Sequence, residues 1–580
     1  MPPEDRIRDH LDFLYGPANG ERTFAALSQR LEDFRRRHPR FSMDVPTGRG
    51  RLTERDVFLI TYGDQISEPG RPPLQTLAEF LERHAGDALG GVHLLPHFPY
   101  SSDDGFSVID YRQVDPQLGD WSDVERVGTR FRLMFDGVIN HVSRESKWFQ
   151  GFRRGQKPYT DYFITCDPKA DLSAVVRPRA LPLLTAIETS AGVKHVWTTF
   201  SHDQIDLNYK NPRVLLEIID VLLFYVEHGA QIIRLDAIAY LWKEIGTSCI
   251  HLPQAHQVVK LFRAMLDAVA PDVLLITETN VPHPDNISYF GDGTDEAQMV
   301  YNFALPPLVL HAFRTGNARV LSNWASTLVS PSPTTTFFNF IASHDGIGLV
   351  PARGLLGDGE IDTLVAAAKD HGGLVSYKTN PDGSPSPYEL NLTLFDALNN
   401  PHAPDAETDA RRFLASQVIM LSLAGVPGIY VHSLFGSHNW HEGVKQTGRP
   451  RTINRRKFQR AALEAELAEP HSLTSRIFHV YRDLLRIRRS HPAFHPNAPQ
   501  KIRSLTDAVF GLVRTAPDGA ETILALVNVT ARPLPVSVDL PALELGATDW
   551  RDLINGAMFD ASNGRLSMQI GGYQSLWLQA

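Results

Sequence analysis

Three apolar, strand-like stretches of the chain end in a carboxylate, at Asp236, Glu278 and Asp345. A hydrophobic core does not favour these residues, because an unpaired buried charge is costly. The carboxyl ends of parallel strands meet at one edge of a sheet or barrel, so the three acids predict a shared polar site there. Each acid taken alone also fits the N-cap of the helix after its strand. Arg234 and His344, which stand close to two of the acids in the sequence, favour the shared site.

From about residue 55 onward, strand-like stretches alternate with stretches long enough for helices, such as residues 212–227 and 257–269. Eight such units in one α/β domain favour a (β/α)8 barrel, whose active site lies on the loops that follow the strands. We expect the strands at residues 57–62, 91–95, 133–139, 232–237, 273–277, 299–303, 336–341 and 428–431.

Two connections of this barrel are too long to be simple loops. The connection after the third strand is predicted to be an inserted domain. A second long insertion follows the seventh strand and carries a proline-rich loop at residues 380–387.

The two ends of the chain add further units. Apolar residues at helical spacing predict two amphipathic helices within residues 2–38, with a break at residues 16–20. A helix at residues 473–490 is expected to end the barrel, and an antiparallel β domain follows, with strands at residues 508–514, 522–529, 534–540 and 575–579. The predicted domains are an N-terminal helical extension at residues 1–54, a catalytic barrel at 55–141 and 206–495, the inserted domain at 142–205 and the C-terminal β domain at 496–580.

Composition narrows the class of protein. The 580 residues include 57 Lys and Arg against 66 Asp and Glu, and this mild acidity argues against nucleic acid or an anionic membrane as the main partner. Two cysteines are too few for a disulfide framework, and no apolar run approaches the roughly 18 residues of a membrane helix. We expect a cytoplasmic protein that does not bind a membrane. The sequence leaves the oligomeric state open, a homodimer included.

The acids suggest chemistry at a sugar carbon. Two carboxylates close together on strand ends can displace a glycosidic bond, one attacking C1 while the other protonates the leaving oxygen. Arg234 stands two residues before Asp236, hence on the same strand face, where it would keep that carboxylate ionised and oriented. This reasoning predicts sugar transfer without naming a substrate.

Short segments then point to a family. Residues 136–141 (DGVINH), 234–237 (RLDA), Glu278 and residues 343–345 (SHD) resemble, in order, the four signature segments of the α-amylase superfamily of glycoside hydrolases and transglycosidases. Longer runs at residues 91–96, 104–110, 243–249, 303–308 and 344–348 resemble its sucrose phosphorylase branch. Within that branch the chain is most similar to the glucosylglycerate phosphorylases, through residues 199–209, 242–252 and 380–389.

The resemblance implies a role for each site residue. Asp236 is expected to be the nucleophile, Glu278 the general acid/base and Asp345 the transition-state stabiliser. A guanidinium forks onto phosphate oxygens well, and Arg177 and Arg179 fall where the family places a cation for phosphate. The residues expected to bind the donor glucose are Asp103, Phe106, His141, His344 and Arg451.

The acceptor side departs from the sucrose-splitting members. They carry His where this chain has Asn280, and Gln after the acceptor-loop tyrosine, where Glu389 follows Tyr388. We expect Lys378 to meet the glycerate carboxylate and Glu389 a hydroxyl of the acceptor. In the alternative interpretation, Lys378 is a solvated loop lysine and Glu389 pairs with a neighbouring arginine.

The resemblance implies a reversible, retaining α-glucosyl phosphorylase that acts on 2-O-α-glucosyl-glycerate. Inorganic phosphate would be the co-substrate, and α-glucose 1-phosphate and glycerate the products. Three alternatives remain: a sucrose or sucrose 6′-phosphate phosphorylase, an α-glucosidase or transglucosidase on the same barrel, and a sugar-binding module descended from an enzyme. The last would be expected to have lost one of the three acids, which are all present.

No metal or other cofactor is expected. His251 and His256 have the wrong helical spacing for a two-histidine metal site, and the usual calcium motif of the superfamily is not evident. Cys249 has no evident base beside it, so we expect a buried apolar residue and not a nucleophile.

Overall fold

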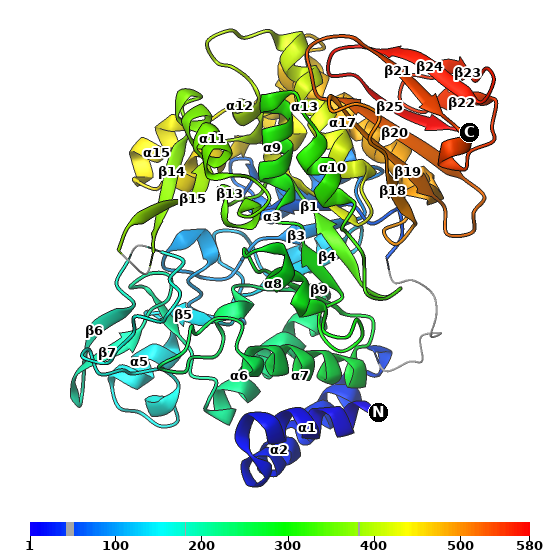
Figure 1. The fold of residues 1–580 in the computed structure, drawn as a ribbon. Coiled ribbons are helices and arrows are strands. Elements are labelled where there is room, and N and C mark those ends of the chain that lie inside the picture. Colours follow the sequence, from blue (N-terminus) through cyan, green and yellow to red (C-terminus); the bar gives the residue numbers. More distant parts are fainter. Residues whose placement is uncertain (42–51, 180, 381–382) are drawn as a thin grey trace.

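Eight parallel strands close into a barrel in the computed structural model, which describes residues 1–41, 52–179, 181–380 and 383–580 (Figure 1). All eight predicted strands are present, so the predicted barrel is confirmed. Seven of them end one or two residues before their predicted ends and β10 ends at its predicted end, so the acids follow the strands and do not lie within them. Around the barrel the strands are β1 (Phe58–Thr61), β3 (Gly91–Leu94), β4 (Arg132–Gly137), β9 (Ala230–Leu235), β10 (Leu274–Thr277), β11 (Met299–Tyr301), β12 (Thr336–Asn339) and β16 (Val426–Tyr430).

Helices cover the outside of the barrel because each buries one apolar face against the strands. The helix α6 (Pro212–Glu227) is capped at its N-terminus by Asn211, whose side chain accepts a hydrogen bond from the Arg213 N–H. The helices α7 (Pro253–Val269) and α17 (Leu473–Ser490) lie where the sequence predicted them.

The N-terminal helices are α1 (Pro3–Tyr15) and α2 (Pro17–Arg37), which pack on each other and on α7 (Figure 1). The predicted break at residues 16–20 is wrong in extent. The chain turns at Gly16 alone, with φ at 74°. Pro17 then starts the second helix, because a proline at the first helical position loses no hydrogen bond.

The long connection after β4 forms a small unit of its own. Its ends, β5 (His141–Ser143) and β8 (Gln204–Asp206), pair antiparallel, and the hairpin β6 (Leu184–Thr189) to β7 (Gly192–Trp197) projects between them. Cys249 packs with Trp197 in a small apolar cluster of this region and is buried, as the sequence predicted.

The insertion after β12 is more regular than a loop. Strands β14 (Leu374–Thr379) and β15 (Pro385–Asn391) pair antiparallel, and β15 also pairs with β13 (Ile347–Gly348), which follows Asp345 closely. Residues 381–382 of the predicted proline-rich loop lie outside the described residues. The insertion therefore attaches its strands directly to the chain that carries the third acid.

The C-terminal part is antiparallel, with a six-stranded and a two-stranded sheet. Four strands were predicted: β19 (Val509–Thr515), β20 (Thr522–Asn528), β21 (Leu534–Asp539) and β25 (Ser575–Gln579). The prediction missed β18 (Gln500–Ile502), β22 (Asp549–Asp552), β23 (Met558–Asp560) and β24 (Arg565–Ile570). The exact domain boundaries stay a prediction.

Candidate active site

A pocket at the carboxyl ends of the barrel strands brings together Asp236, Glu278 and Asp345. The other residues that line it and that the sequence predicted are Asp103, Phe106, His141, Arg179, Asn280, His344, Tyr388 and Arg451. Phe200, Gln204 and Ala237 line it too, and the prediction missed them.

Asp236 follows β9 and is oriented by Arg234. One guanidinium nitrogen of Arg234 donates to Asp236 Oδ1 at 2.9 Å and also to the buried carboxylate of Asp136. The strand register of β4 and β9 places Asp136 opposite Arg234, and His93 contacts Asp136 at 2.7 Å. Arg234 is thus a buried cation between two carboxylates, and its partners fix it in place.

Glu278 follows β10, and the turn after Asp236 holds it. The Ala237 N–H donates to Glu278 Oε2 at 3.0 Å. Ala237 has φ at 50°, a left-handed conformation that a residue with a Cβ rarely adopts. The surrounding structure holds this strained conformation, and strain of this kind clusters at functional sites.

Burial raises the pKa of both Asp236 and Glu278. Arg234 opposes the rise in both, but it donates a hydrogen bond to Asp236, whereas Glu278 accepts only a backbone N–H among the hydrogen bonds of the described residues. Hydrogen bonds to the charged form favour that form. The hydrogen-bond pattern thus favours a proton on Glu278 and an ionised Asp236. This is the division of roles that glycosidic bond cleavage requires.

Asp345 lies among cations. Burial opposes its ionisation, but Arg451 and Arg455, joined by His344 only where acid pH protonates that ring, hold the pKa of Asp345 far below its usual range. Arg451 contacts Asp345 Oδ1 at 2.5 Å. The His344 ring stacks on Phe106 with centroids 5.0 Å apart, and burial lowers the pKa of His344 to about 3. His344 is accordingly neutral while Asp345 is charged.

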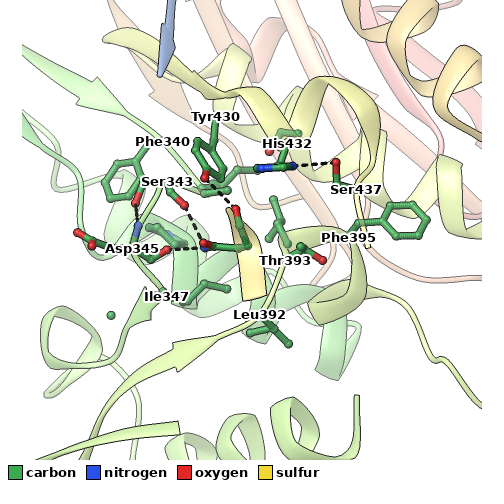
Figure 2. A pocket seen from close by; sticks show the side chains of 18 of the residues that line it. Phe340, Ser343, Asp345, Ile347, Leu392, Thr393, Phe395, Tyr430, His432 and Ser437 are labelled. Atoms are coloured by element: carbon green, nitrogen blue, oxygen red, sulfur yellow. Dashed lines mark hydrogen bonds between the residues drawn. The ribbon is translucent and has the colours of Figure 1, made fainter. Parts of the chain in front are cut away.

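Hydrogen bonds from the Asn454 side chain to the backbone fix the turn that carries Asp345. Asn454 donates its side-chain N–H groups to the carbonyls of Ser343 at 3.2 Å and Asp345 at 2.9 Å. The Tyr430 hydroxyl donates in turn to the Asn454 carbonyl at 2.8 Å. Figure 2 shows Tyr430, Ser343 and Asp345 around this turn. Asp345 is therefore held through its backbone as well as through its carboxylate.

Glu389 is buried, with 2 % of its surface exposed, and both its oxygens are engaged. One accepts from the Gly346 N–H and the other from the guanidinium of Arg451, at 3.2 Å. Pairing of Glu389 with an arginine was the alternative interpretation of the sequence, and this contact is present. A role for Glu389 in holding an acceptor hydroxyl stays a proposal.

Four predicted residues, Glu389 and three others, are absent from the described lining of the pocket. Arg234 lies behind Asp236. Arg177 belongs to a segment anchored by the Val176 N–H, which donates to the Ser248 carbonyl at 3.0 Å. Lys378 is half-buried on β14, where burial and then Arg353 lower its pKa. The roles of Arg177 and Lys378 stay predictions.

Gln204 reaches the pocket through the pairing of β5 with β8, and Phe200 precedes β8 in the chain. Gln204 Nε2 donates to the Phe106 carbonyl at 2.9 Å and lies 3.1 Å from His141 Nε2. Both residues stand inside segment 199–209, which carried the resemblance to the family. That segment was the signal that could have identified them.

His251 and His256 have other partners. His251 Nδ1 lies 3.0 Å from the Tyr289 hydroxyl, and His256 Nδ1 lies 3.0 Å from Glu296. Among the described residues, no cluster of three or more His, Cys, Asp or Glu side chains would hold a metal ion. Within the same part of the chain, every helix is too short or too polar to span a membrane.

Comparison with known proteins places the chain among phosphorylases. The α-amylase catalytic-domain family matches residues 88–346. The chain is 51% identical to a glucosylglycerate phosphorylase of Spirochaeta thermophila, over 100% of this chain and 99% of the relative. It is 56% identical to a glucosylglycerate phosphorylase of Allomeiothermus silvanus, over 93% of this chain and 95% of the relative.

A solved structure supports the fold. The sucrose 6F-phosphate phosphorylase from Thermoanaerobacter thermosaccharolyticum superposes with a TM-score of 0.71 at 27% identity, covering 82% of this chain and 94% of that chain. The relatives named for glucosylglycerate are thus about twice as similar in sequence as this one.

Proposed function

This chain belongs to the sucrose phosphorylase branch of the α-amylase superfamily, and we propose that it catalyses the reversible phosphorolysis of 2-O-α-glucosyl-glycerate to α-glucose 1-phosphate and glycerate. The observation that carries the proposal is the 51% identity with a glucosylglycerate phosphorylase over the whole chain. The intact set of three acids in one pocket agrees with it.

The reaction proceeds by two displacements at the same carbon. Asp236 attacks C1 of the glucosyl unit while Glu278 gives its proton to the departing glycerate oxygen, leaving a glucosyl ester on Asp236. In the second step a phosphate oxygen attacks C1, Glu278 takes a proton from the phosphate, and the ester bond breaks. Two inversions give overall retention of the α configuration.

The other groups act through charge. Asp345, held ionised by Arg451, faces the positive charge that develops on the sugar ring in the transition state. Arg179 lines the pocket, and we propose that it binds the incoming phosphate. The assignment of Asp103, Phe106, His141, His344 and Arg451 to the donor glucose is part of the same proposal, which needs no cofactor beyond phosphate as a co-substrate. A cytoplasmic location stays a prediction.

Glycerate recognition is proposed for the acceptor strand β15 and its neighbour β14. Asn280 and Tyr388 line the pocket on this side, and Lys378 is the cation assigned to the glycerate carboxylate. Since Glu389 pairs with Arg451, its negative charge is offset, and it does not meet glycerate as a free carboxylate.

A phosphorolysis screen tests the proposal. Purified protein is given glucosylglycerate, sucrose or sucrose 6′-phosphate, with and without inorganic phosphate, and α-glucose 1-phosphate is measured. The fastest release is expected from glucosylglycerate and only with phosphate. Faster reaction of either sucrose compound would refute the acceptor assignment, whereas release of free glucose at the same rate without phosphate would make the protein a glucosidase.

A further inference from the structure

Lys243 is a buried cation in the wall behind the pocket. Its side chain is 3% exposed, and its Nζ contacts Asp206 Oδ2 at 2.6 Å and Asn140 Oδ1 at 2.7 Å. It stands in segment 242–252, which carried the family resemblance but takes no part in the reaction described above. Burying a lysine has a large desolvation cost. The position of Lys243 between Asp206 and Asn140 therefore calls for an explanation.

The lysine fixes the orientation of the Asn140 amide. An ammonium group has only donors, so the amide atom that faces it must be the oxygen. The NH2 end of Asn140 then points the other way, toward Asp206 Oδ2 at 3.2 Å and His141 Nδ1 at 3.2 Å. Thr199 also donates to Asp206, from its N–H at 2.9 Å and its hydroxyl at 2.6 Å, so the carboxylate has donors on both oxygens.

The orientation of Asn140 decides where the His141 ring carries its proton. A donor opposite Nδ1 requires that this nitrogen be an acceptor, and burial lowers the pKa of His141, which favours the neutral ring. The single ring proton is then on Nε2, where the Phe106 carbonyl accepts it at 2.9 Å.

Gln204 is the one contact that could argue for the other tautomer. Its Nε2 lies 3.1 Å from His141 Nε2 and would donate to it if that nitrogen carried a lone pair. The same Gln204 nitrogen donates to the Phe106 carbonyl at 2.9 Å, and a carbonyl oxygen has two lone pairs. Phe106 can therefore accept from both side chains, so the Gln204 contact is compatible with a proton on His141 Nε2.

We propose that Lys243 is a positioning residue that fixes the proton of His141 on Nε2 through the amide of Asn140. His141, Phe106 and Gln204 all line the pocket, so the fixed proton holds the His141 ring to the Phe106 carbonyl at the pocket wall. A substrate then meets side chains whose positions are set before binding, which saves reorganisation. The tautomer itself does not depend on the reaction, whereas its effect on turnover rests on the proposed function.

Nitrogen NMR of the histidine rings tests the tautomer directly. In histidine-labelled protein, the His141 signals are identified by their loss in the His141→Gln variant. Nε2 is expected to carry the proton and Nδ1 to be unprotonated. The variant Asn140→Asp keeps a partner for Lys243 but puts an acceptor opposite Nδ1, so the proton should move to Nδ1. A wild-type ring protonated on Nδ1, or an Asn140→Asp ring that keeps Nδ1 unprotonated, would overturn the proposal.

A double variant tests the role of Lys243 without changing the net charge of the site. The double variant Asp206→Asn, Lys243→Met removes cation and anion together, so no buried charge is left unpaired. The Asn140 amide is then free to turn, and both tautomers of His141 should appear. The matched control is Lys210→Met, which removes an exposed lysine paired with Glu244 beside the same segment and should leave the His141 signals unchanged. A single unchanged tautomer in the double variant would refute the role of Lys243.

Kinetics separate this inference from the proposed function. In Asn140→Asp and in the double variant, KM for the glucoside should rise about tenfold with a smaller change in kcat, because the pocket wall at His141 is no longer prepositioned. Lys210→Met should keep both constants. If the wild-type spectrum shows the proton on Nε2 but no glucoside is phosphorolysed, the proposed function is refuted and the assigned tautomer of His141 is supported. If phosphorolysis occurs while Nδ1 is protonated, the inference fails alone.

Discussion

Arg451 and Glu389, which lie 62 positions apart in the chain, form a largely buried ion pair at 3.2 Å. The same guanidinium contacts the carboxylate of Asp345 at 2.5 Å. One arginine thus joins the strand proposed to recognise the acceptor to the acid proposed to stabilise the transition state. Its charge is shared by two carboxylates that approach it from different segments.

The roles of the two catalytic carboxyls predict different losses. Asp236→Asn should lower kcat by at least about 10⁴-fold with any glucosyl donor, because an amide cannot form the covalent ester. Glu278→Gln should lower it by about 10²- to 10⁴-fold with glucosylglycerate, but much less with a donor such as α-glucosyl fluoride, whose leaving group needs no proton. Steady-state rates with both donors measure the difference. Equal losses of Glu278→Gln with the two donors would exclude it as the acid.

Arg179 should contribute more to phosphorolysis of the glucosyl-enzyme than to its hydrolysis. Removing a charge-assisted hydrogen bond to phosphate costs about 1.5–3 kcal/mol, so Arg179→Ala should slow phosphorolysis by about 10- to 100-fold. Slow hydrolysis of the same glucosyl-enzyme needs no such contact and should change little. The exposed Arg154, in the same inserted region, provides the control variant Arg154→Ala. Equal losses in both reactions would place phosphate binding elsewhere, with Lys378 the next residue to test.

The pH profile should report the protonation of Glu278. Burial raises its pKa, so the proton needed for bond cleavage is present at neutral pH and is lost as pH rises through that raised value. The rate with glucosylglycerate should therefore fall on the alkaline side, and it should fall on the acid side as Asp236 becomes protonated. A donor that needs no proton should keep its rate on the alkaline side. An alkaline fall that is identical for both donors would assign that limb to another group.

Acceptor preference should depend on Asn280 and Glu389. Exchanging Asn280 for His and Glu389 for Gln gives the pair found in sucrose-splitting members and removes a negative charge. The ratio of kcat/KM for sucrose to that for glucosylglycerate should then rise by about tenfold or more. Because Glu389 also holds Arg451, the absolute rate with both donors should fall in Glu389→Gln alone. An unchanged ratio in the double variant would remove these two residues from acceptor recognition.

Much of the barrel could be predicted because its signals are local. An apolar stretch that ends in a charged residue shows both a strand and its carboxyl end, so Asp236, Glu278 and Asp345 could be placed in one site before any contact was known. The hairpin of β14 and β15 could not be predicted in the same way. The prolines and glycine of that segment indicate turns, whereas residues 385–391 form a strand that pairs with β14 on one side and β13 on the other.

Residues without charge were the hardest part of the site to predict. Phe200 and Gln204 have no charge or strand-end position to mark them, and only the family resemblance of segment 199–209 could have indicated them. Gln204 reaches the pocket because it pairs with Ser143 across the whole inserted region, a contact that no local pattern contains. The sequence also could not identify which arginine pairs with Glu389, because only the fold brings Arg451 next to it.

The pairing of β15 with β13 limits how this enzyme can acquire a new acceptor. Glu389 pairs with Gly348 in that ladder and accepts a hydrogen bond from Gly346, immediately after Asp345. A loop grafted from a relative with another preference would change the surroundings of Asp345 along with those of the acceptor. Evolution toward a new acceptor would thus have to pass through slower intermediates, or keep residues 386–391 fixed while varying the segments around them.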